Sequence, residues 1–451
     1  MANTKRYWSG LDELHETEAF KAIQAQEFPE SQSVDEFLSD EQLESTHTGR
    51  RDFLKFMGFS LTAATLAACE TPVVKSIPYT NKPAEVTPGV ANHYASTYYD
   101  GQNFVNVLVK TREGRPIFVK ANNQTGVAAP NARVIASVMS LYDSARLTGP
   151  QIDGNAAEWS AVDAEVAASL GKGGRNVILT NTVMSPSLKR AVSLAGLEHI
   201  QYDAIDYGAF RKAAELDYGV NTFPSYKFEE AQAIVTIGAD FLGTFGDAVW
   251  YKENWAKTRN PESGSMSRMH AFETNMSLTG SNADYRSMVK PSEHGKVATA
   301  LLNAVSGRGA AGALSEGVQA AVSAAAKDLK AAGKNALVLS GSNDLNVQRV
   351  VNAINEALGA TGTTVKFESN DLFQGSSAAL AKLTQDMAAG RVNTLIVADC
   401  NPAYDAANAA AFSAALGKVN LTVSTATVAD ETASQCRVIA PTHHWLECSL
   451  H

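Results

Sequence analysis

Polar residues follow three short apolar runs, at positions where expected strands give way to loops. The three stretches are Gly238-Ala239-Asp240, Gly341-Ser342-Asn343-Asp344 and Asp399–Asp405. Open parallel sheets bind ligands at the carboxyl ends of their strands, so these loops are the best candidates for a ligand site. The backbone amides of the second stretch could hold a phosphate at the start of the next helix. The same residue types are also ordinary turn formers and helix caps, so both interpretations stay open.

Other familiar catalytic patterns are absent or misplaced. Residues 307–312 spell G-x-G-x-x-G, but a dinucleotide site needs a strand before that motif, and here the helical run 297–306 precedes it. We therefore predict a turn between two helices. Neither G-x-S-x-G nor H-E-x-x-H occurs, so neither a serine-hydrolase elbow nor a zincin site is supported.

Histidines give no convincing metal site. His270 and Glu273 lie three residues apart, but no third ligand is evident. His443 and His444 are adjacent, so their side chains point in different directions on either a helix or a strand. We expect no metal site and no catalytic residue in this chain.

The four cysteines are Cys69, Cys400, Cys436 and Cys448, and no two of them form C-x-x-C. Zinc ribbons and cluster-binding loops are therefore not expected in this segment. In an oxidising compartment a Cys400–Cys436 or a Cys436–Cys448 disulfide is chemically possible. Small buried hydrophobic residues are the interpretation that we favour.

Residues 48–69 have the pattern of an export signal of the twin-arginine (Tat) type. The signal residues are Arg50, Arg51, Phe53, Leu54 and Lys55. The apolar run 56–68 that follows is too short to span a bilayer comfortably, because a spanning helix needs about 20 apolar residues. It is also only moderately apolar, which suits the Tat route for folded proteins better than the Sec route.

The same stretch ends in Leu66-Ala67-Ala68-Cys69, which is similar to a bacterial lipobox. Lipidation of Cys69 would hold the chain at a membrane surface. The alternatives are an amphipathic helix with a buried cysteine and an uncleaved helix inserted in the membrane. We therefore predict export by Tat and a place at the periplasmic face of the cytoplasmic membrane.

Composition describes a globular chain without nucleic-acid chemistry. Of its 451 residues, 45% are hydrophobic and 19% charged, and the net charge is −9. No basic stripe offsets this charge, so we expect no nucleic-acid partner. Residues 1–47 contain 11 acidic and 3 basic residues, which is typical of a docking tail or of a disordered leader.

From about residue 151 short apolar runs alternate with amphipathic helical runs, which predicts an α/β fold with doubly wound, mostly parallel sheets. The predicted parts are an acidic leader (1–47), the signal and lipobox (48–69), an extended strap (70–102), a hairpin and helix (103–150), a first α/β domain (151–300) with an irregular insert (239–294), and a second α/β domain (301–451). The last domain looks truncated in the sequence.

Several stretches together resemble the N-terminal part of the ActB-type subunits of alternative complex III, a quinol-oxidising respiratory complex. They are KRYWSGLDEL, GRRDFLKFMG, SIPYTNKPAEVTPG, VKTREGRPIFV, ADFLGTF, MSLTGSNADYR, NPAYD and APTHHWLE. The resemblance covers nearly the whole chain. It implies domains like those of the dimethyl-sulfoxide-reductase (molybdopterin oxidoreductase) fold.

The resemblance also implies a role. Members of the family are thought to have lost molybdopterin from this half, and their iron–sulfur clusters lie in a separate C-terminal half. The chain would then be a non-catalytic subunit that meets the membrane surface, quinol-oxidising membrane subunits, a multihaem cytochrome c subunit and the iron–sulfur half. The alternatives are an active molybdopterin-dependent oxidoreductase fragment and a periplasmic ligand-binding lipoprotein.

Overall fold

The computed structural model describes residues 86–447, except 88, 126–128, 265 and 309–313, together with residues 15, 17, 18 and 21. The chain separates into a unit of residues 1–82 and a unit of residues 83–451. Every element below belongs to the second unit. The predicted signal residues, Cys69 and Cys448 lie outside the described residues, so the export and lipidation predictions remain predictions. None of the described helices is both long and apolar enough to cross a membrane.

A three-stranded antiparallel sheet opens the second unit. Its strands are β1 (Ala91–Tyr99), β2 (Phe104–Arg112) and β3 (Arg115–Ala121), and helix α6 (Ala132–Leu141) packs against it. Alternate valines of β2 are buried against α6, which explains the strand pattern there. The predicted hairpin and helix are confirmed. The stretch predicted as an extended strap contains β1, whose Tyr- and Thr-containing residues pair with β2 along their whole length.

A seven-stranded sheet follows, in the order β5-β4-β16-β15-β14-β6-β7. Its strands are β4 (Gln151–Ile152), β5 (Asn155–Ala156), β6 (Asn176–Thr180), β7 (Glu198–Gln201), β14 (Thr394–Ala398), β15 (Leu421–Ser424) and β16 (Val438–Ile439). From β16 to β7 the neighbours run parallel. The helices of this part are α7 (Trp159–Gly171), α8 (Pro186–Leu194), α15 (Ser377–Ala388), α16 (Pro402–Asp405) and α17 (Ala409–Leu416).

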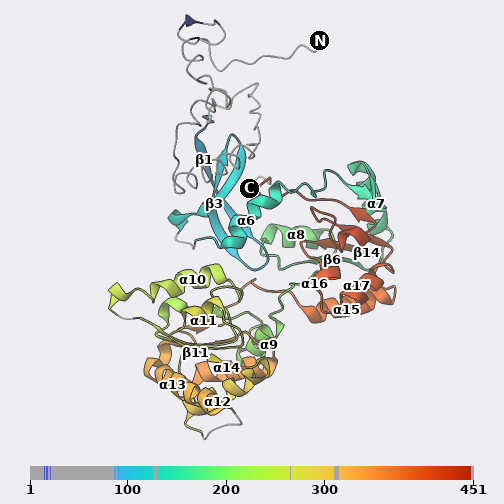
Figure 1. Cartoon of the computed structure of the whole chain (residues 1–451). Coiled ribbons are helices and arrows are strands. Elements are labelled where there is room, and N and C mark those ends of the chain that lie inside the picture. The colour runs from blue at the N-terminus through green and yellow to red at the C-terminus, as the bar shows by residue number, and fades with distance from the viewer. Residues whose placement is uncertain are drawn as a thin grey trace, which may run out of the picture. The chain divides into compact units, whose positions relative to one another are not determined.

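A second parallel sheet has four strands, in the order β11-β10-β9-β12. Its strand β11 is labelled in Figure 1. Its strands are β9 (Ala233–Ile237), β10 (Arg268–Glu273), β11 (Tyr285–Met288) and β12 (Ala336–Ser340). The helices of this part are α9 (Gly208–Tyr218), α10 (Ala248–Lys257), α11 (Leu278–Asn282), α12 (His294–Ser306), α13 (Glu316–Ala332) and α14 (Leu345–Ala357). Two short strands, β8 (Ser225–Tyr226) and β13 (Val365–Lys366), pair with each other in antiparallel fashion. Aliphatic residues of α12, α13 and α14 cover one face, and an aromatic cluster covers the other.

The predicted irregular insert at 239–294 is therefore wrong, because β10 and β11 complete the four-stranded sheet within it. Polar residues concealed β10 in the sequence. His270 is buried on this strand, where its Nε2 lies 2.9 Å from Asp328 Oδ2 and its ring stacks on Tyr285. A buried histidine with a polar partner and a stacked ring can replace the apolar residue that a buried strand usually carries.

The strand order also shows that the predicted domain boundary at residue 300 is wrong. β12 joins strands from before that point, and β14–β16 join β6 and β7 from the first half of the chain. The four-stranded sheet is thus inserted between two halves of the seven-stranded sheet. The mixed α/β fold with parallel sheets agrees with the prediction. The G-x-G-x-x-G motif begins where expected, since Gly307 ends α12 with φ +70°.

Candidate functional site

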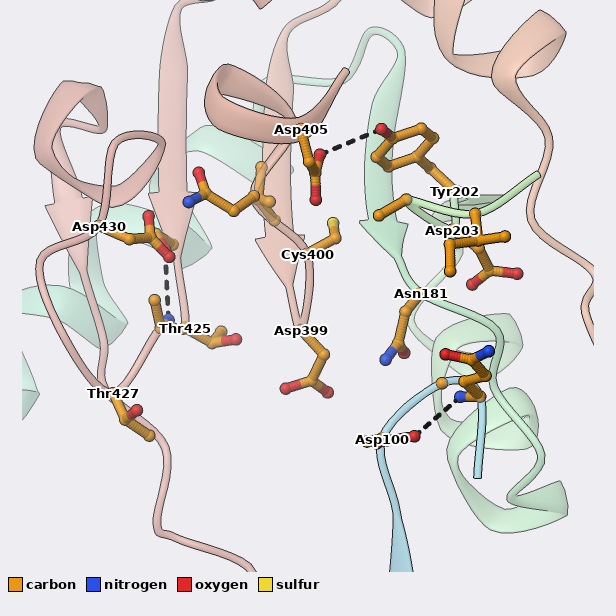
Figure 2. A pocket seen from close by; sticks show the side chains of 18 of the residues that line it. Asp100, Asn181, Tyr202, Asp203, Asp399, Cys400, Asp405, Thr425, Thr427 and Asp430 are labelled. Atoms are coloured by element: carbon orange, nitrogen blue, oxygen red, sulfur yellow. Dashed lines mark hydrogen bonds between the residues drawn. The ribbon is translucent and has the colours of Figure 1, made fainter. Parts of the chain in front are cut away.

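A pocket of about 470 Å³ lies at the carboxyl edge of the seven-stranded sheet. The central neighbours there are β14 and β6. The chain leaves β6 toward β7 on one side and leaves β14 toward β15 on the other. This divergence opens a crevice beyond the strand ends, which is where doubly wound sheets bind ligands. Figure 2 shows residues from these strand ends together with Asp100, which follows β1.

Carboxylates dominate the charge of the pocket. Asp100, Asp203, Asp399, Asp405 and Asp430 all line it. Arg133 is the single basic side chain among the described residues that line the pocket. Its Nη1 lies 3.4 Å from Asp100 Oδ2. Arg133 is 53% exposed and already paired, so it offsets little of the negative charge. The remaining lining residues are neutral.

Asp399 stands directly after β14, at the centre of the crevice. Its φ is +55°, a left-handed conformation that only a small fraction of non-glycine residues adopt. Figure 2 shows its carboxylate directed away from the strand end. Within the described part of the chain this carboxylate has neither a hydrogen bond nor an ion pair. Asp399 is exposed to solvent in the pocket, and partial desolvation by the surrounding pocket atoms raises its pKa.

Asp203, by contrast, is a structural residue. It is buried, and it accepts hydrogen bonds from Thr182 N (2.8 Å), Thr182 Oγ1 (2.6 Å) and Gly375 N (2.9 Å). Three donors satisfy a buried carboxylate without any ligand. Asp203 therefore joins the end of β6 to the segment that re-enters the seven-stranded sheet before α15.

Three further titratable groups line the same pocket: Tyr202, Asp405 and Cys400. Tyr202 Oη donates to Asp405 Oδ1 over 3.0 Å, and burial raises the pKa of both groups. Burial also raises the pKa of the Cys400 thiol, and the negative charges of nearby aspartates, first among them Asp405 and Asp399, raise it further. The thiol therefore stays protonated and is a poor nucleophile at neutral pH. Cys400 and Cys436 are both free, in agreement with the favoured interpretation.

The Asn401-Pro402 turn holds a neighbouring loop in place. Asn401 Oδ1 accepts from Thr432 N (3.1 Å) and from Thr432 Oγ1 (2.6 Å), while its Nδ2 donates to Glu431 Oε2 (2.7 Å). Asp430 accepts from the backbone N–H of Thr432 and of Ala433. Both side chains are thus occupied by the protein itself, and they shape the pocket rather than wait for a ligand.

The other two strand-end loops predicted as ligand sites, 238–240 and 341–344, do not form open sites in the described structure. A Cβ at Gly341 would lie 2.2 Å from the carbonyl oxygen of Gly238, so the ends of β9 and β12 are in close contact. The His294 ring fills the space beside Gly238. Asp240 Oδ1 accepts from Thr279 N and Thr279 Oγ1. The protein's own side chains therefore occupy the crevice of the four-stranded sheet.

The histidine and glutamate candidates also have protein partners. Glu273 accepts from Arg286 Nε (2.5 Å) and Ser277 Oγ (2.6 Å) and does not meet His270. His444 Nε2 lies 2.9 Å from Ser140 Oγ, and the neighbouring His443 is exposed. Among the residues that the structure describes, no three His, Cys, Asp or Glu side chains come together in a way that could hold a metal ion.

Of the pocket residues, the sequence pointed to Asp399, Cys400, Asn401 and Asp405, which lie together as expected. It missed Asp100, Asn181, Asp203 and Asp430. Asp100 and Asn181 directly follow β1 and β6, and Asp203 follows β7 by two residues, so polar residues after a strand were the available signal. The sequence could not show that these strand ends meet, because the pairing of β6 with β14 joins distant parts of the chain.

Comparison with known proteins shows a similarity of fold alone. No family model matches the sequence, and no curated protein matches it. Acetylene hydratase from Pelobacter acetylenicus has a similar structure, with a TM-score of 0.58 and 12% identity over 79% of this chain and 62% of that one. The formyltransferase/hydrolase complex from Methylorubrum extorquens with methylofuran matches with a TM-score of 0.45 and 16% identity over 65% and 86% of the two chains, which is too low to support an argument. The chain thus spans 62% of the acetylene hydratase chain and shares its α/β fold.

Proposed function

We propose that this chain is a non-catalytic, molybdopterin-oxidoreductase-like subunit of a membrane-bound quinol:electron-acceptor oxidoreductase, of the ActB type found in alternative complex III. Its two parallel sheets then correspond to domains of the dimethyl-sulfoxide-reductase fold. The structural similarity to acetylene hydratase and the sequence stretches quoted above support this proposal. The role is to scaffold electron transfer between partner subunits at the outer face of the membrane.

The lining of the pocket is the observation that carries the non-catalytic part. Molybdopterin is bound through phosphate groups, which need backbone amides or basic side chains. The crevice of the seven-stranded sheet instead presents five aspartates and one paired arginine. The crevice of the four-stranded sheet is filled by His294 and by the contact of Gly238 with Gly341. The residues present do not fit the cofactor, so we assign no reaction step to it.

The proposal extends to location and partners. Arg50, Arg51 and the following Phe-Leu-Lys direct export by Tat, and Cys69 carries a lipid at the periplasmic membrane face. The partners are quinol-oxidising membrane subunits, a multihaem cytochrome c subunit and an iron–sulfur half or subunit. The iron–sulfur clusters belong to that partner half, and this segment itself holds no cofactor.

Purification of the chain from native membranes tests the role. We expect haem-containing and quinol-oxidising subunits to co-purify, while metal analysis and pterin fluorescence detect neither molybdenum nor pterin bound to this chain. Stoichiometric molybdenum would identify an active oxidoreductase fragment instead. Isolation of the chain without membrane subunits would contradict the scaffolding role.

Two variants test the location separately. Replacing Arg50 and Arg51 by lysine should retain the chain in the cytoplasm, since the Tat receptor reads the arginine pair. Cys69→Ser should leave export intact but remove the lipid and release the chain from the membrane. Mass spectrometry of the mature N-terminus measures the lipid directly. An unmodified Cys69 in the wild-type chain contradicts the lipid anchor and leaves the Tat signal unaffected.

A further inference from the structure

A second cavity, of about 590 Å³, lies beside the three-stranded sheet and shares no lining residue with the strand-end pocket. Residues of β1 and β2 line it on one side, and the β2–β3 turn, the end of α6 and the segment 445–447 line the others. We call this cavity the sheet pocket. Its size and its mainly apolar lining are typical of small-molecule sites.

Contacts within the protein hold the walls of the sheet pocket in place. Tyr142 Oη donates to the carbonyl oxygen of Pro116 over 2.7 Å, which joins the end of α6 to β3. Arg146 donates to both carboxylate oxygens of Glu447, over 3.2 and 2.5 Å, and to Leu141 O over 2.8 Å. A ligand therefore meets walls that are already fixed, which lowers the entropic cost of binding.

Two hydrogen-bond donors of the sheet pocket have no acceptor among the described residues. Trp445 Nε1 is buried and unpaired, while its ring packs edge-on against Tyr98 with the ring centroids 5.2 Å apart. Buried N–H groups nearly always have an acceptor in folded proteins. Arg115 is exposed at the same pocket and makes neither a hydrogen bond nor an ion pair in the described part of the chain. The neighbouring Glu113 accepts from Gly89 N instead.

We propose that the sheet pocket binds an aromatic carboxylate. The aromatic ring of the ligand packs against Tyr94, Tyr142 and Trp445, of which the first two are 50% and 55% exposed. The carboxylate oxygens accept from Arg115 and from Trp445 Nε1, the two donors that lack an acceptor. The inference goes beyond the scaffolding role and does not depend on it, because it rests on this pocket alone.

The charges of the sheet pocket favour an anion over a cation. Glu447 is the acidic side chain among the described residues that line it, and Arg146 pairs with both of its oxygens. The charge of Arg115 is left uncompensated. An organic cation would find aromatic faces here, but it would meet an unpaired guanidinium and offer no acceptor to Trp445 Nε1. A hydrocarbon would leave both donors unsatisfied.

Titration calorimetry of the full-length chain with cinnamate at low ionic strength tests the proposal. We expect saturable binding of one cinnamate per chain and no binding of cinnamylammonium, a cation of similar shape. Arg115→Gln should weaken cinnamate binding about tenfold, since one charge contact is lost. Trp445→Phe keeps an aromatic ring without the N–H and should weaken binding about fivefold. Arg115 is exposed, so its variant tests the site even where Trp445→Phe folds poorly.

Lys120→Gln is the matched control, because it removes one positive charge from an exposed residue of β3 that does not line the sheet pocket. Its affinity for cinnamate should equal that of the wild type. Equal weakening by Lys120→Gln and Arg115→Gln would overturn the site in favour of general electrostatic attraction. Undetectable cinnamate binding, or equal binding of cinnamate and cinnamylammonium, would also overturn it.

NMR of the tryptophan indole N–H groups follows the buried donor directly. Trp445→Phe identifies the Trp445 signal by its disappearance. Cinnamate should shift this signal in the wild-type chain and leave that of the exposed Trp159 on α7 unchanged. A Trp445 signal that stays in place at saturating cinnamate would overturn the assigned site.

Discussion

At the scale of single residues, Asp203 and Asp399 show that two aspartates in one pocket can have different roles. Both are aspartates near the carboxyl ends of strands. Asp203 is buried and accepts three hydrogen bonds, whereas Asp399 is exposed in the pocket and accepts none from the residues that the structure describes. The first holds the structure together, whereas the second is open to solvent.

Replacing Asp203 by alanine should be strongly destabilising. The change leaves the backbone N–H and the hydroxyl of the fully buried Thr182 without their acceptor. We expect the free energy of unfolding to fall by about 2–4 kcal/mol, measured by urea titration. Asp163→Ala on the exposed face of α7 should change it by less than about 0.5 kcal/mol. A change of that small size in Asp203→Ala would show that water replaces the carboxylate.

The sequence identified part of the pocket at this scale. Asp399–Asp405 stood out because it follows the strongly apolar run of β14. Asp203 did not, because two residues separate it from β7 and its partners Thr182 and Gly375 lie 21 and 172 residues away in the chain. Local sequence patterns reveal which residues end a strand, but not which distant backbone groups they will bind.

At the scale of elements, the N-terminus of α10 carries a pH-sensitive cap. Asp247 accepts from Trp250 N over 3.2 Å, and burial raises its pKa from 3.8 to about 6. The folded state therefore holds this proton more tightly than the unfolded state does. The contribution of Asp247 to stability falls as the pH rises from about 4 to about 6 and is constant above that range.

Asp247→Asn should remove this fall in stability at higher pH, because asparagine also caps helices but carries no charge. The variant should be more stable than the wild type at pH 7.5, by on the order of 2 kcal/mol, and the difference should vanish below about pH 4. Urea titrations at the two pH values measure it. Asp344→Asn, at the exposed start of α14, is the control, with an expected change below about 0.5 kcal/mol at both. A pH-independent difference for Asp247→Asn would contradict the assignment.

The junction of β9 and β12 should tolerate no side chain at Gly341. A Cβ there would lie 2.2 Å from Gly238 O and 3.2 Å from Ala239 Cα, both backbone atoms. Gly341→Ala should lower the free energy of unfolding by about 2–4 kcal/mol. Gly317→Ala has open space on α13 and should raise it by up to about 1 kcal/mol. Similar values for the two variants would mean that the strand ends separate easily.

The sequence predicted most helices and buried strands at this scale, because their periodicity is local. It missed β1 and β10 for different reasons. β1 lies in a Pro- and Thr-rich stretch that suggested an extended strap, and only its pairing with β2 makes it a strand. β10 carries the polar residues Arg268, His270 and Glu273, which find polar partners in Asp328 and Arg286 from other elements.

At the scale of the whole molecule, the inserted sheet should fold without the rest of the chain. Both clusters of buried residues around β9–β12 come entirely from residues 207–373, and the main cluster of the seven-stranded sheet contains none of them. A fragment of residues 207–373 should therefore unfold cooperatively on heating, as followed by circular dichroism. The fragment 151–300 lacks β12 and β14 and should not. Cooperative unfolding of both fragments would contradict this division.

Neither the order of the strands nor the insertion was visible in the sequence. The alternation of helix and strand looks the same whether a sheet is continuous or interrupted. What distinguishes them is the pairing of β14 with β6, over five residue pairs far apart in the chain. The similarity to acetylene hydratase agrees with this architecture.

The interrupted sheet also imposes a delay during synthesis. About 200 residues separate the end of β6 from the start of β14. A ribosome that adds 5–20 residues per second needs about 10–40 s to cover that distance. During this time β6 has β7 beside it on one edge and nothing on the other, and an open apolar strand edge invites pairing with other chains. We therefore expect chaperones to shield β6 in the nascent chain until β14 leaves the ribosome.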